Sequence, residues 1–562
     1  MRKAYVLAGA MLAALLLAVL ATTPPGTRGL VAGAAQEFSA GRAMLDVRQI
    51  ASAPHPTGSA ENARVRAYIA GRMAALGMDV STQQGTVGER AAAKFNRWTG
   101  RNDPPPVLTN VIGVLPGTDR NLPAVLLMAH HDTVWGSPGA ADDTAGIAAS
   151  LEGVRAIRER GPQRRDLIVL ATDAEELGLE GAKLFFAEHP LRERVGAVIN
   201  MEARGGGGRT TLFQTSAQNG EAVALYRDAV ARPGASSLSA YVYSVLPNDT
   251  DLTPVLKGPY TAYNFAFIGR SGLYHSPKAT PERLDQGALQ DMGGQVLDLT
   301  AALLEAEQLP GKAPDRVFFD LFGLMTITYP VWLGWVMLAL GLGGCVATLR
   351  GGALREIGNG AGRTAALLLG SGALITALNV ISMGPGKPNY YDRLAAISRL
   401  EAMALLGGTA AFLAVFGSWR GSRAANAGAL LPLLVLALAA QAIAPTAAYI
   451  LVLPVMLGGL ALALAGKDRA LNLQAAVALL VTGYMLALGH QLMQGVGPTM
   501  AGAAALPLTL ATVTLLPLWT PLPRRALMRA SGALLLAGLA VALWVRLDAP
   551  ADTIAAYADT KS

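Results

Sequence analysis

The segment HHDTVWGSPGAADD, residues 130–143, places two histidines and three aspartates within fourteen residues, next to glycines and a proline. Imidazole and carboxylate groups are the side chains that bind zinc in hydrolases and that transfer protons in general acid–base catalysis. The single cysteine, Cys345, lies in an apolar run, so a cysteine-based zinc site and a disulfide framework are both excluded. A metal site in this chain must therefore use histidine and carboxylate ligands.

Short apolar runs in the first half of the chain indicate strands that would position these residues. The runs alternate with helical patterns, and after the first of them Ile147, Leu151 and Val154 recur at helical spacing. This alternation predicts an α/β fold with a mostly parallel sheet and helices on both faces. The predicted strands are residues 124–130, 166–174, 196–203, 210–216 and 261–269.

Acids and histidines follow the ends of four of these strands. Because ligand sites in parallel sheets lie beyond the carboxyl ends of the strands, we expect these groups to meet at one edge of the sheet. Carboxylates crowded in this way repel one another, and a divalent cation would relieve the repulsion. The groups are His130 and Asp132 after the first strand, Asp142 at the start of the following helix, Glu175 and Glu176 after the second strand, Glu202 at the end of the third and His275 beyond the last.

This set of side chains matches what a pair of zinc ions requires. Two zinc ions about 4 Å apart need a bridging carboxylate and roughly one histidine and one further carboxylate each. We predict that His130 and Glu202 bind one zinc ion and that Glu176 and His275 bind the other. Asp142 is predicted to bridge the two ions.

Two more acids are predicted to act beside the metals. Asp132 lies two residues beyond His130, so its carboxylate is expected to accept the other ring N–H of that histidine and to fix its tautomer. Glu175 is adjacent to a predicted ligand and is the candidate general base. It would take a proton from the metal-bound water and pass it to the departing amine.

Several of these positions also have a simpler structural interpretation. Asp142 and Asp143 are compatible with a helix N-cap and a first-turn acid, and Glu175 with Glu176 is compatible with a solvated turn. His131 is expected to be structural or to face solvent. His55 and His189 are expected at the surface or in the packed interior, and His55 could instead lie at the rim of the cleft. For Asp249 and Asp251 two positions are compatible with the sequence, the substrate cleft and a plain turn. The metal site is favoured because it accounts for the acids and histidines together.

The composition divides the chain into two parts with different surroundings. Of the 562 residues, 52% are hydrophobic and only 15% are charged, well below the roughly 25% that is usual in soluble domains. Residues 36–310 have an ordinary mixed composition, whereas residues 325–547 are rich in Leu, Ala, Gly and Val. The net charge of +7 is not gathered into a basic stripe, so nucleic acid is not expected as a partner.

Residues 325–547 are predicted to form a transmembrane domain of about eight helices in contact with membrane lipid. A spanning helix needs about 17 or more apolar residues. Eight runs reach this length or come close to it: residues 325–349, 364–383, 400–419, 427–443, 447–465, 473–490, 500–518 and 530–545. No Asp, Glu, Lys or Arg lies near the middle of these runs, so the function is expected in residues 36–310. Residues 1–23 are predicted to be a signal anchor or a cleaved signal peptide.

The distribution of Lys and Arg predicts the orientation in the membrane. With the N-terminus in the cytoplasm, ten basic residues of this half lie in cytoplasmic loops and five lie outside, which agrees with the positive-inside rule. Residues 36–310 and the tail, residues 548–562, would then face the exterior, which for a bacterial-type inner membrane is the periplasm. The ten are Arg350, Arg355, Arg363, Arg420, Arg423, Lys467, Arg469, Arg524, Arg525 and Arg529, and the five are Lys387, Arg393, Arg399, Arg546 and Lys561.

The motifs and their order resemble metallopeptidase family 28 of clan MH, the co-catalytic zinc aminopeptidases. AHHDTVWGSPGAADDTAG is similar to the H-x-D … G-A-x-D-D pattern of that family, and DAEELGLEGA, NMEARG and YHSPKATPERL fit its later motifs over residues 40–308. SPGAADD, ARGGGGRTTLFQT, LPNDTD and VFFDLFGLMTITYP further resemble the endoplasmic-reticulum metallopeptidase 1 branch, which has a polytopic membrane half. Many secreted relatives have Asp where Glu202 stands, and this branch shares the Glu.

The resemblance implies a membrane-bound exopeptidase with two Zn²⁺ per chain that hydrolyses peptides outside the cytoplasm, most simply an aminopeptidase. No residue that would hold the substrate ammonium is identifiable from the sequence, so carboxypeptidase, dipeptidase and glutaminyl-cyclase activities stay open. A second class of function is a non-catalytic peptide-binding receptor or transport component. The presence of a candidate base, Glu175, beside the predicted ligands argues against that class.

Overall fold

The chain is organised as two compact units. The computed structural model describes residues 2–30, 34–246, 248–349, 352–386, 388–464 and 470–548. The first unit, here called the α/β unit, contains Thr23–Thr328 and the separate segment Asn389–Ala395. The second, here called the helical unit, contains Met1–Thr22, Tyr329–Pro388 and Ala396–Ala549.

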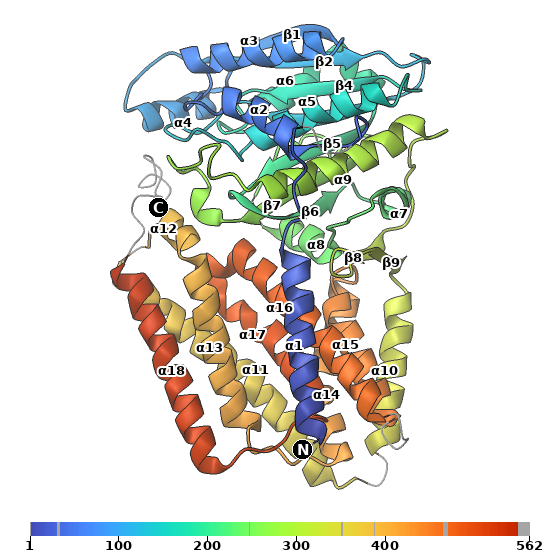
Figure 1. The fold of residues 1–562 in the computed structure, drawn as a ribbon, viewed down its shortest axis with the longest axis vertical. Coiled ribbons are helices and arrows are strands. Elements are labelled where there is room, and N and C mark those ends of the chain that lie inside the picture. Colours follow the sequence, from blue (N-terminus) through green and yellow to red (C-terminus); the bar gives the residue numbers. More distant parts are fainter. Residues whose placement is uncertain are drawn as a thin grey trace. The chain divides into compact units, whose positions relative to one another are not determined.

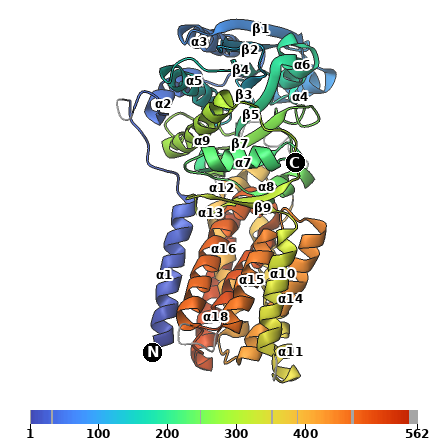
Figure 2. The ribbon, with the colours of Figure 1, turned by 90° about the vertical axis from the view of Figure 1, so that its right-hand side faces the viewer.

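A seven-stranded sheet forms the centre of the α/β unit (Figure 2). The strand order is β1-β2-β4-β3-β5-β7-β6, and the neighbours from β4 to β7 run parallel to one another. Strands β1 and β2 at one edge and β6 at the other pair antiparallel. The predicted α/β fold with a mostly parallel sheet is confirmed. The strands are β1 Asp79–Thr86, β2 Val107–Leu115, β3 Ala124–His130, β4 Leu167–Thr172, β5 Val195–Ala203, β6 Gly207–Thr215 and β7 Thr261–Gly269.

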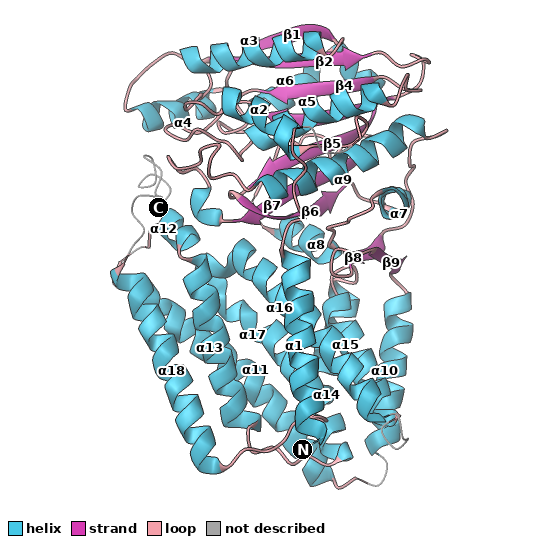
Figure 3. Ribbon diagram, in the orientation of Figure 1, coloured by secondary structure: helices cyan, strands magenta, loops and turns pink. Residues whose placement is uncertain are grey.

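The central strands are apolar along their length because helices cover both faces of the sheet (Figure 3). Strands β3 and β4 are buried at every position, as expected for parallel strands between two helix layers. Helices α2, α3, α5 and α9 share a core with Leu127, and α6 shares a core with Leu126 on the opposite face. The helices of the first chain segment are α2 Ala40–Ile50, α3 Ala60–Ala75, α4 Glu89–Thr99, α5 Thr144–Glu159, α6 Glu180–Glu188, η1 Pro190–Arg194, α7 Gly220–Ala229, α8 Ser237–Val245, η2 Ser271–Leu273 and α9 Gln286–Glu305.

The strand order reverses beside β3. The chain passes from β3 through α5 to β4 on one side, and from β4 through α6 to β5 on the other side. Since α5 and α6 cover opposite faces, the loops that leave the carboxyl ends of these strands diverge. Open α/β sheets hold ligands at such a point. The segments that follow β3, β4, β5 and β7 therefore open onto the same edge.

The C-terminal part of the chain is helical, as predicted (Figure 1). In the described ranges, six stretches have the length and the apolar composition to span a membrane, and α10 and α15 are shorter apolar helices. Helix α1 packs against α16, α10 against α15, and α13 against α18. The helices are α1 Arg2–Thr22, α10 Leu333–Leu349, α11 Leu354–Met383, α13 Ile397–Phe416, α14 Arg423–Ile443, α15 Tyr449–Ala463, α16 Ala470–Met500, η3 Ala501–Ala504, α17 Ala505–Leu515 and α18 Arg524–Leu547.

The first predicted membrane run, residues 325–349, differs from the structure at its start. Thr326–Pro330 forms strand β9, which pairs with β8, Arg316–Asp320, and helix α10 begins only at Leu333. The segment TITYP is rich in β-branched and aromatic residues, and Pro330 lacks the N–H that a helix interior needs.

Part of the charge pattern falls outside the ranges that the structure describes. These residues are Arg350, Lys387, Lys467, Arg469 and Lys561, together with 549–562 of the predicted tail. The orientation in the membrane therefore stays a prediction from the sequence.

Candidate metal centre

His130, Asp142 and Glu202 come together at the carboxyl ends of β3 and β5. His130 is the last residue of β3, and its Nε2 lies 3.1 Å from Asp142 Oδ1 and 3.9 Å from Glu202 Oε2. Asp142 reaches this position from the loop before α5. Gly139 allows the loop to fold back, because its φ is +62° and a Cβ there would lie 2.4 Å from Thr133 Cγ2. The three side chains could hold one metal ion.

His275 forms a second group around the same carboxylate. Its Nε2 lies 3.2 Å from Asp142 Oδ2 and 2.9 Å from Glu176 Oε1. Asp142 thus presents one oxygen to each histidine. The loop that carries Asp142 is fixed to the segment of His275 by a backbone hydrogen bond from Ala140 N to Ala279 O, 3.0 Å long.

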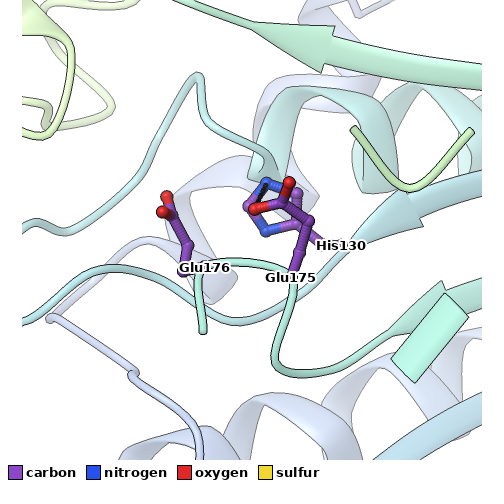
Figure 4. Close-up of side chains that lie close together, drawn as sticks. All are labelled: His130, Glu175 and Glu176. Atoms are coloured by element: carbon purple, nitrogen blue, oxygen red, sulfur yellow. Dashed lines mark ion pairs between the residues drawn. The ribbon is translucent and has the colours of Figure 1, made fainter. Parts of the chain in front are cut away.

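Glu175 and Glu176 follow β4, and Figure 4 shows Glu175 over the ring of His130 and Glu176 to one side of it. Glu175 lies beside the ring of His130, with Oε2 4.0 Å from Nε2, whereas Glu176 is directed toward His275. Ala174 has a φ of +61°, in the left-handed region, where the chain turns out of β4. This turn lets two consecutive glutamates serve different parts of the cluster.

Asp132 holds this loop in place and also lies beside the ring of His130. Its Oδ1 accepts a hydrogen bond from Glu175 N at 3.0 Å, and its Oδ2 accepts one from Glu176 N at 3.2 Å. His130 Nδ1 lies 2.9 Å from the backbone carbonyl of Asp132 and 3.6 Å from its carboxylate. The Asp132 carboxylate thus accepts two backbone N–H groups and also lies beside the ring of His130, so its predicted role in orienting that ring stays a prediction.

The cluster concentrates negative charge in a buried place. Burial raises the pKa of Glu175 and of Glu202 well above the usual value, and neighbouring carboxylates raise both further. Burial opposes ionisation of Asp142 as well, but its contacts with His130 and His275 lower its pKa below the usual value. Burial alone would lower the pKa of His130, yet hydrogen bonds to Asp132 and Asp142 raise it. Cations would stabilise such a set of ionised carboxylates.

Asp143, His131, His55 and His189 take part in capping or packing within the α/β unit. Asp143 caps α5, since its carboxylate accepts a hydrogen bond from Gly146 N at 3.2 Å. His131 is buried and its Nε2 contacts Thr109 O at 3.0 Å. His55 is buried as well, and burial lowers its pKa to about 4. His189 stacks on Phe185 with a centroid distance of 5.0 Å.

Asp249 and Asp251 lie in different environments, the first exposed and the second buried. Asp249 is exposed and accepts a hydrogen bond from the hydroxyl of Thr253. Asp251 is buried, accepts a hydrogen bond from the Thr172 hydroxyl, and has a pKa raised to about 6 by burial. The charge of Asp251 acts on Glu175 and Glu202, so this acid belongs to the surroundings of the cluster. Pro247 of the LPNDTD segment lies outside the described residues.

One contact to the cluster was not predicted from the sequence. Tyr391 lies in α12, Tyr390–Ala395, and its hydroxyl is 3.1 Å from His275 Nδ1. From the sequence, this stretch is expected in a loop between two membrane helices. No spacing or periodicity connects it with residues 130–275.

Comparisons with known proteins agree with the motifs. Residues 110–300 match the model of peptidase family M28. The chain is 32% identical to endoplasmic reticulum metallopeptidase 1 of Mus musculus over 235 residues, which are 40% of this chain and 26% of that protein. It is 31% identical to the vacuolar membrane protease of Yarrowia lipolytica over 319 residues, 53% of this chain and 31% of that protein. The chain thus spans a third or less of the length of these two curated relatives.

Solved structures with a similar chain course are also found. An aminopeptidase from Aneurinibacillus sp. strain AM-1 has 14% sequence identity and a TM-score of 0.39, covering 50% of this chain and 97% of that one. A glutaminyl cyclase from Porphyromonas gingivalis has 19% identity and a TM-score of 0.37, covering 47% of this chain and 97% of that one. The match of residues 110–300 to the family model confirms the family resemblance seen in the motifs.

Proposed function

We propose that the chain is a membrane-bound exopeptidase that uses two zinc ions and removes residues from the N-terminus of peptides outside the cytoplasm. The observation that carries this proposal is the position of Asp142, whose two oxygens lie within 3.2 Å of the Nε2 atoms of His130 and His275. Glu202 completes one side and Glu176 the other. One histidine and one carboxylate for each ion, with a shared carboxylate, is a donor set that fits two zinc ions.

Glu175 is proposed as the general base. Two zinc ions, when bound, would polarise the scissile carbonyl and make water a better nucleophile. Glu175 lies beside the cluster, and burial raises its pKa, which makes its carboxylate a stronger base. It accepts a proton from the attacking water and delivers it to the departing amine. Asp132 holds the backbone of Glu175 in place.

Asp251 supports aminopeptidase over carboxypeptidase specificity. An aminopeptidase must hold the substrate ammonium with negative charge, whereas a carboxypeptidase needs a cation for the substrate carboxylate. Asp251 is a buried acid that stays unassigned after the proposed ligands and base are named, and its charge acts on Glu175 and Glu202. We propose that it contributes to binding the ammonium group.

Substrate specificity is tested with the purified full chain and matched peptides. We expect cleavage of peptide amides that have a free N-terminus, and no cleavage of the same peptides after N-acetylation. Cleavage of N-acetylated peptides with a free carboxylate would instead indicate a carboxypeptidase. Cyclisation of N-terminal glutamine would indicate a glutaminyl cyclase.

Glu175→Gln separates catalysis from metal binding. The variant keeps the size and hydrogen-bonding capacity of the side chain but cannot accept the proton, so kcat should fall by about 10²–10⁴-fold. Metal analysis should still find two zinc ions per chain. Glu188→Gln, on the exposed end of α6, is the matched control and should behave as wild type. Wild-type turnover in Glu175→Gln would remove this residue as the base.

A further inference from the structure

A short helix that is remote in sequence belongs to the α/β unit. Helix α12, Tyr390–Ala395, lies in the chain between α11 and α13, which are both long and apolar enough to span a membrane. The segment Asn389–Ala395 nevertheless packs as part of the α/β unit and not with the helices on either side of it in the chain. Helix α12 packs on η2, the turn that ends two residues before His275.

Tyr391 places its hydroxyl against the ring of His275. The hydroxyl oxygen is 3.1 Å from His275 Nδ1, and the tyrosine is 1% exposed. The other ring nitrogen of His275, Nε2, is directed toward Glu176 and Asp142. Tyr274 stacks on the same imidazole with a centroid distance of 3.6 Å. The two nitrogens of His275 therefore face two different environments, the acid cluster and α12.

The contact determines which nitrogen of His275 can bind a metal. When Nδ1–H donates to the tyrosine oxygen, Nε2 carries the lone pair and points at the proposed zinc site. His275 has a φ of +56°, in the left-handed region, so the packing around it must hold the residue in this conformation. His130 differs, because its Nδ1 is satisfied by a carbonyl of its own loop, that of Asp132.

A second contact lies on the same helix. The hydroxyl of Tyr390 accepts a hydrogen bond from Arg204, and the Arg204 guanidinium also lies 5.8 Å from the Tyr390 ring centroid. Arg204 is two residues beyond Glu202. Helix α12 thus contacts the segments that carry His275 and Glu202.

We propose that Tyr391 is a positioning residue that orients His275 for zinc binding, so that a segment between two membrane-length helices completes the metal centre of the α/β unit. This inference rests on the proposed function, in which His275 is a zinc ligand. The hydroxyl acts on one of the two zinc ions, the one shared by Glu176, His275 and Asp142. The ring of the other proposed histidine ligand, His130, is held by the backbone carbonyl of Asp132 and not by α12.

Tyr391→Phe in the full chain tests this role, because it removes the hydroxyl and keeps the ring. The readout is zinc content after dialysis against chelator-buffered zinc. We expect one of the two zinc ions to bind about 10–100-fold more weakly and the other to bind as in wild type. At saturating zinc, KM should stay unchanged. Tyr68→Phe, which removes a hydrogen bond to Asp46 2.7 Å long, is the matched control and should keep both zinc ions.

Gly272→Ala provides an independent variant that leaves Tyr391 intact. A Cβ at Gly272 would lie 2.8 Å from the Cα of Ala395, so α12 must move away from η2. We expect the same weakening of one zinc ion, which makes the result independent of the folding of Tyr391→Phe.

The outcomes distinguish this inference from the proposed function. Two zinc ions at wild-type affinity in folded Tyr391→Phe or Gly272→Ala would overturn the role of Tyr391 while leaving the two-zinc proposal standing. A wild-type chain that binds no zinc would overturn the proposed function, and the role of Tyr391 with it.

Discussion

Asp142 is the residue on which the two halves of the proposed metal centre depend. Its oxygens face different histidines at 3.1 Å and 3.2 Å, so each oxygen serves a separate group of side chains. Glu202 groups with His130 and Asp142, whereas Glu176 groups with Asp142 and His275 and also lies near His130 and Glu175. Loss of Asp142 should therefore have a larger effect on metal content than loss of either glutamate.

Asp142→Asn tests this difference. An amide offers one neutral oxygen in place of two charged ones, so the zinc content should fall from two ions to one or none, whereas Glu202→Gln should lose one ion. Elemental analysis of the purified protein gives the count. Asp143→Asn is the control, since asparagine also caps helices well. Two tightly bound zinc ions in Asp142→Asn would show that the carboxylate does not bridge.

The pKa shifts predict how metal removal depends on pH. In the metal-free protein, the raised pKa values of Glu175, Glu202 and His130 mean that the folded state binds more protons than the unfolded chain. Its stability should therefore fall as the pH rises above the unfolded carboxyl pKa of 4.5. Zinc offsets the charge that then develops. The difference in Tm between zinc-loaded and chelator-treated protein should widen from about pH 5 to about pH 8.

The titration of His55 also changes the stability with pH, but it does not affect this comparison. Its pKa is lowered to about 4 by burial, so its contribution is present above the unfolded value of 6.5 and is lost as the pH falls. This effect is common to the zinc-loaded and metal-free forms and cancels in the difference. A Tm difference that stays constant or narrows with rising pH would contradict the predicted protonation of the cluster.

The sequence predicted which residues gather at the centre but not how each is held. His130, Glu176, Glu202 and His275 follow the ends of parallel strands, and topology alone brings such positions to one edge. The orientation of each side chain depends on contacts that strand patterns do not encode. Asp132 contacts two backbone N–H groups in addition to lying beside the His130 ring, because the turn at Ala174 brings those groups within reach.

At the scale of elements, the loop between β3 and α5 sets the position of Asp142. Gly139 is in the left-handed region with a φ of +62°, and a Cβ there would also lie 2.6 Å from the backbone oxygen of Asp142. An L-residue would meet both backbone strain and a clash. The loop therefore depends on this glycine to bring the carboxylate between the two histidines.

Gly139→Ala should weaken zinc binding and lower stability together. Strain alone costs roughly 1–2 kcal/mol, and the clash moves Asp142 away from the histidines. Gly161→Ala is the matched control, because Gly161 has a φ of +99° but nothing within 4 Å of its Cβ position. It should share the loss of Tm and keep full zinc affinity. Equal zinc affinity in both variants would show that the loop tolerates the added methyl group.

The central strands were predictable because they are apolar. Strands β3, β4, β5 and β7 form continuous buried runs, and each was predicted near its observed bounds. Strand β1 has the sequence DVSTQQGT, which shows no alternation of apolar and polar residues because it lies at the sheet edge. Pairing with β2 determines its conformation, and such pairing cannot be inferred from local sequence.

At the scale of the whole molecule, the chain combines a region that matches the M28 peptidase model with helices long enough to span a membrane. Asn379, Gln441 and His490 are polar residues within α11, α14 and α16. Gln441 donates to the backbone oxygen of Val331 at 3.0 Å, and His490 contacts Glu401 at 3.1 Å. These contacts join different segments of the helical unit, as polar side chains in membrane helices often do.

Reporter fusions test the predicted orientation of the helices. A reporter fused after Asp392 should behave as extracytoplasmic and one fused after Arg423 as cytoplasmic, because α13 lies between the two positions. Alkaline phosphatase and a cytoplasmically active reporter at each site give complementary signals. The reverse pattern would place the region that matches the M28 peptidase model in the cytoplasm.

The hydrogen bond between Tyr391 and His275 joins residues 116 positions apart, with α10 and α11 between them in the chain. Translation proceeds from the N-terminus, so the tyrosine leaves the ribosome only after both of those helices have been made. A nascent chain that ends before α12 would therefore carry every proposed zinc ligand and still lack the partner of one of them. The proposed metal site around His275 would therefore be completed late in biogenesis.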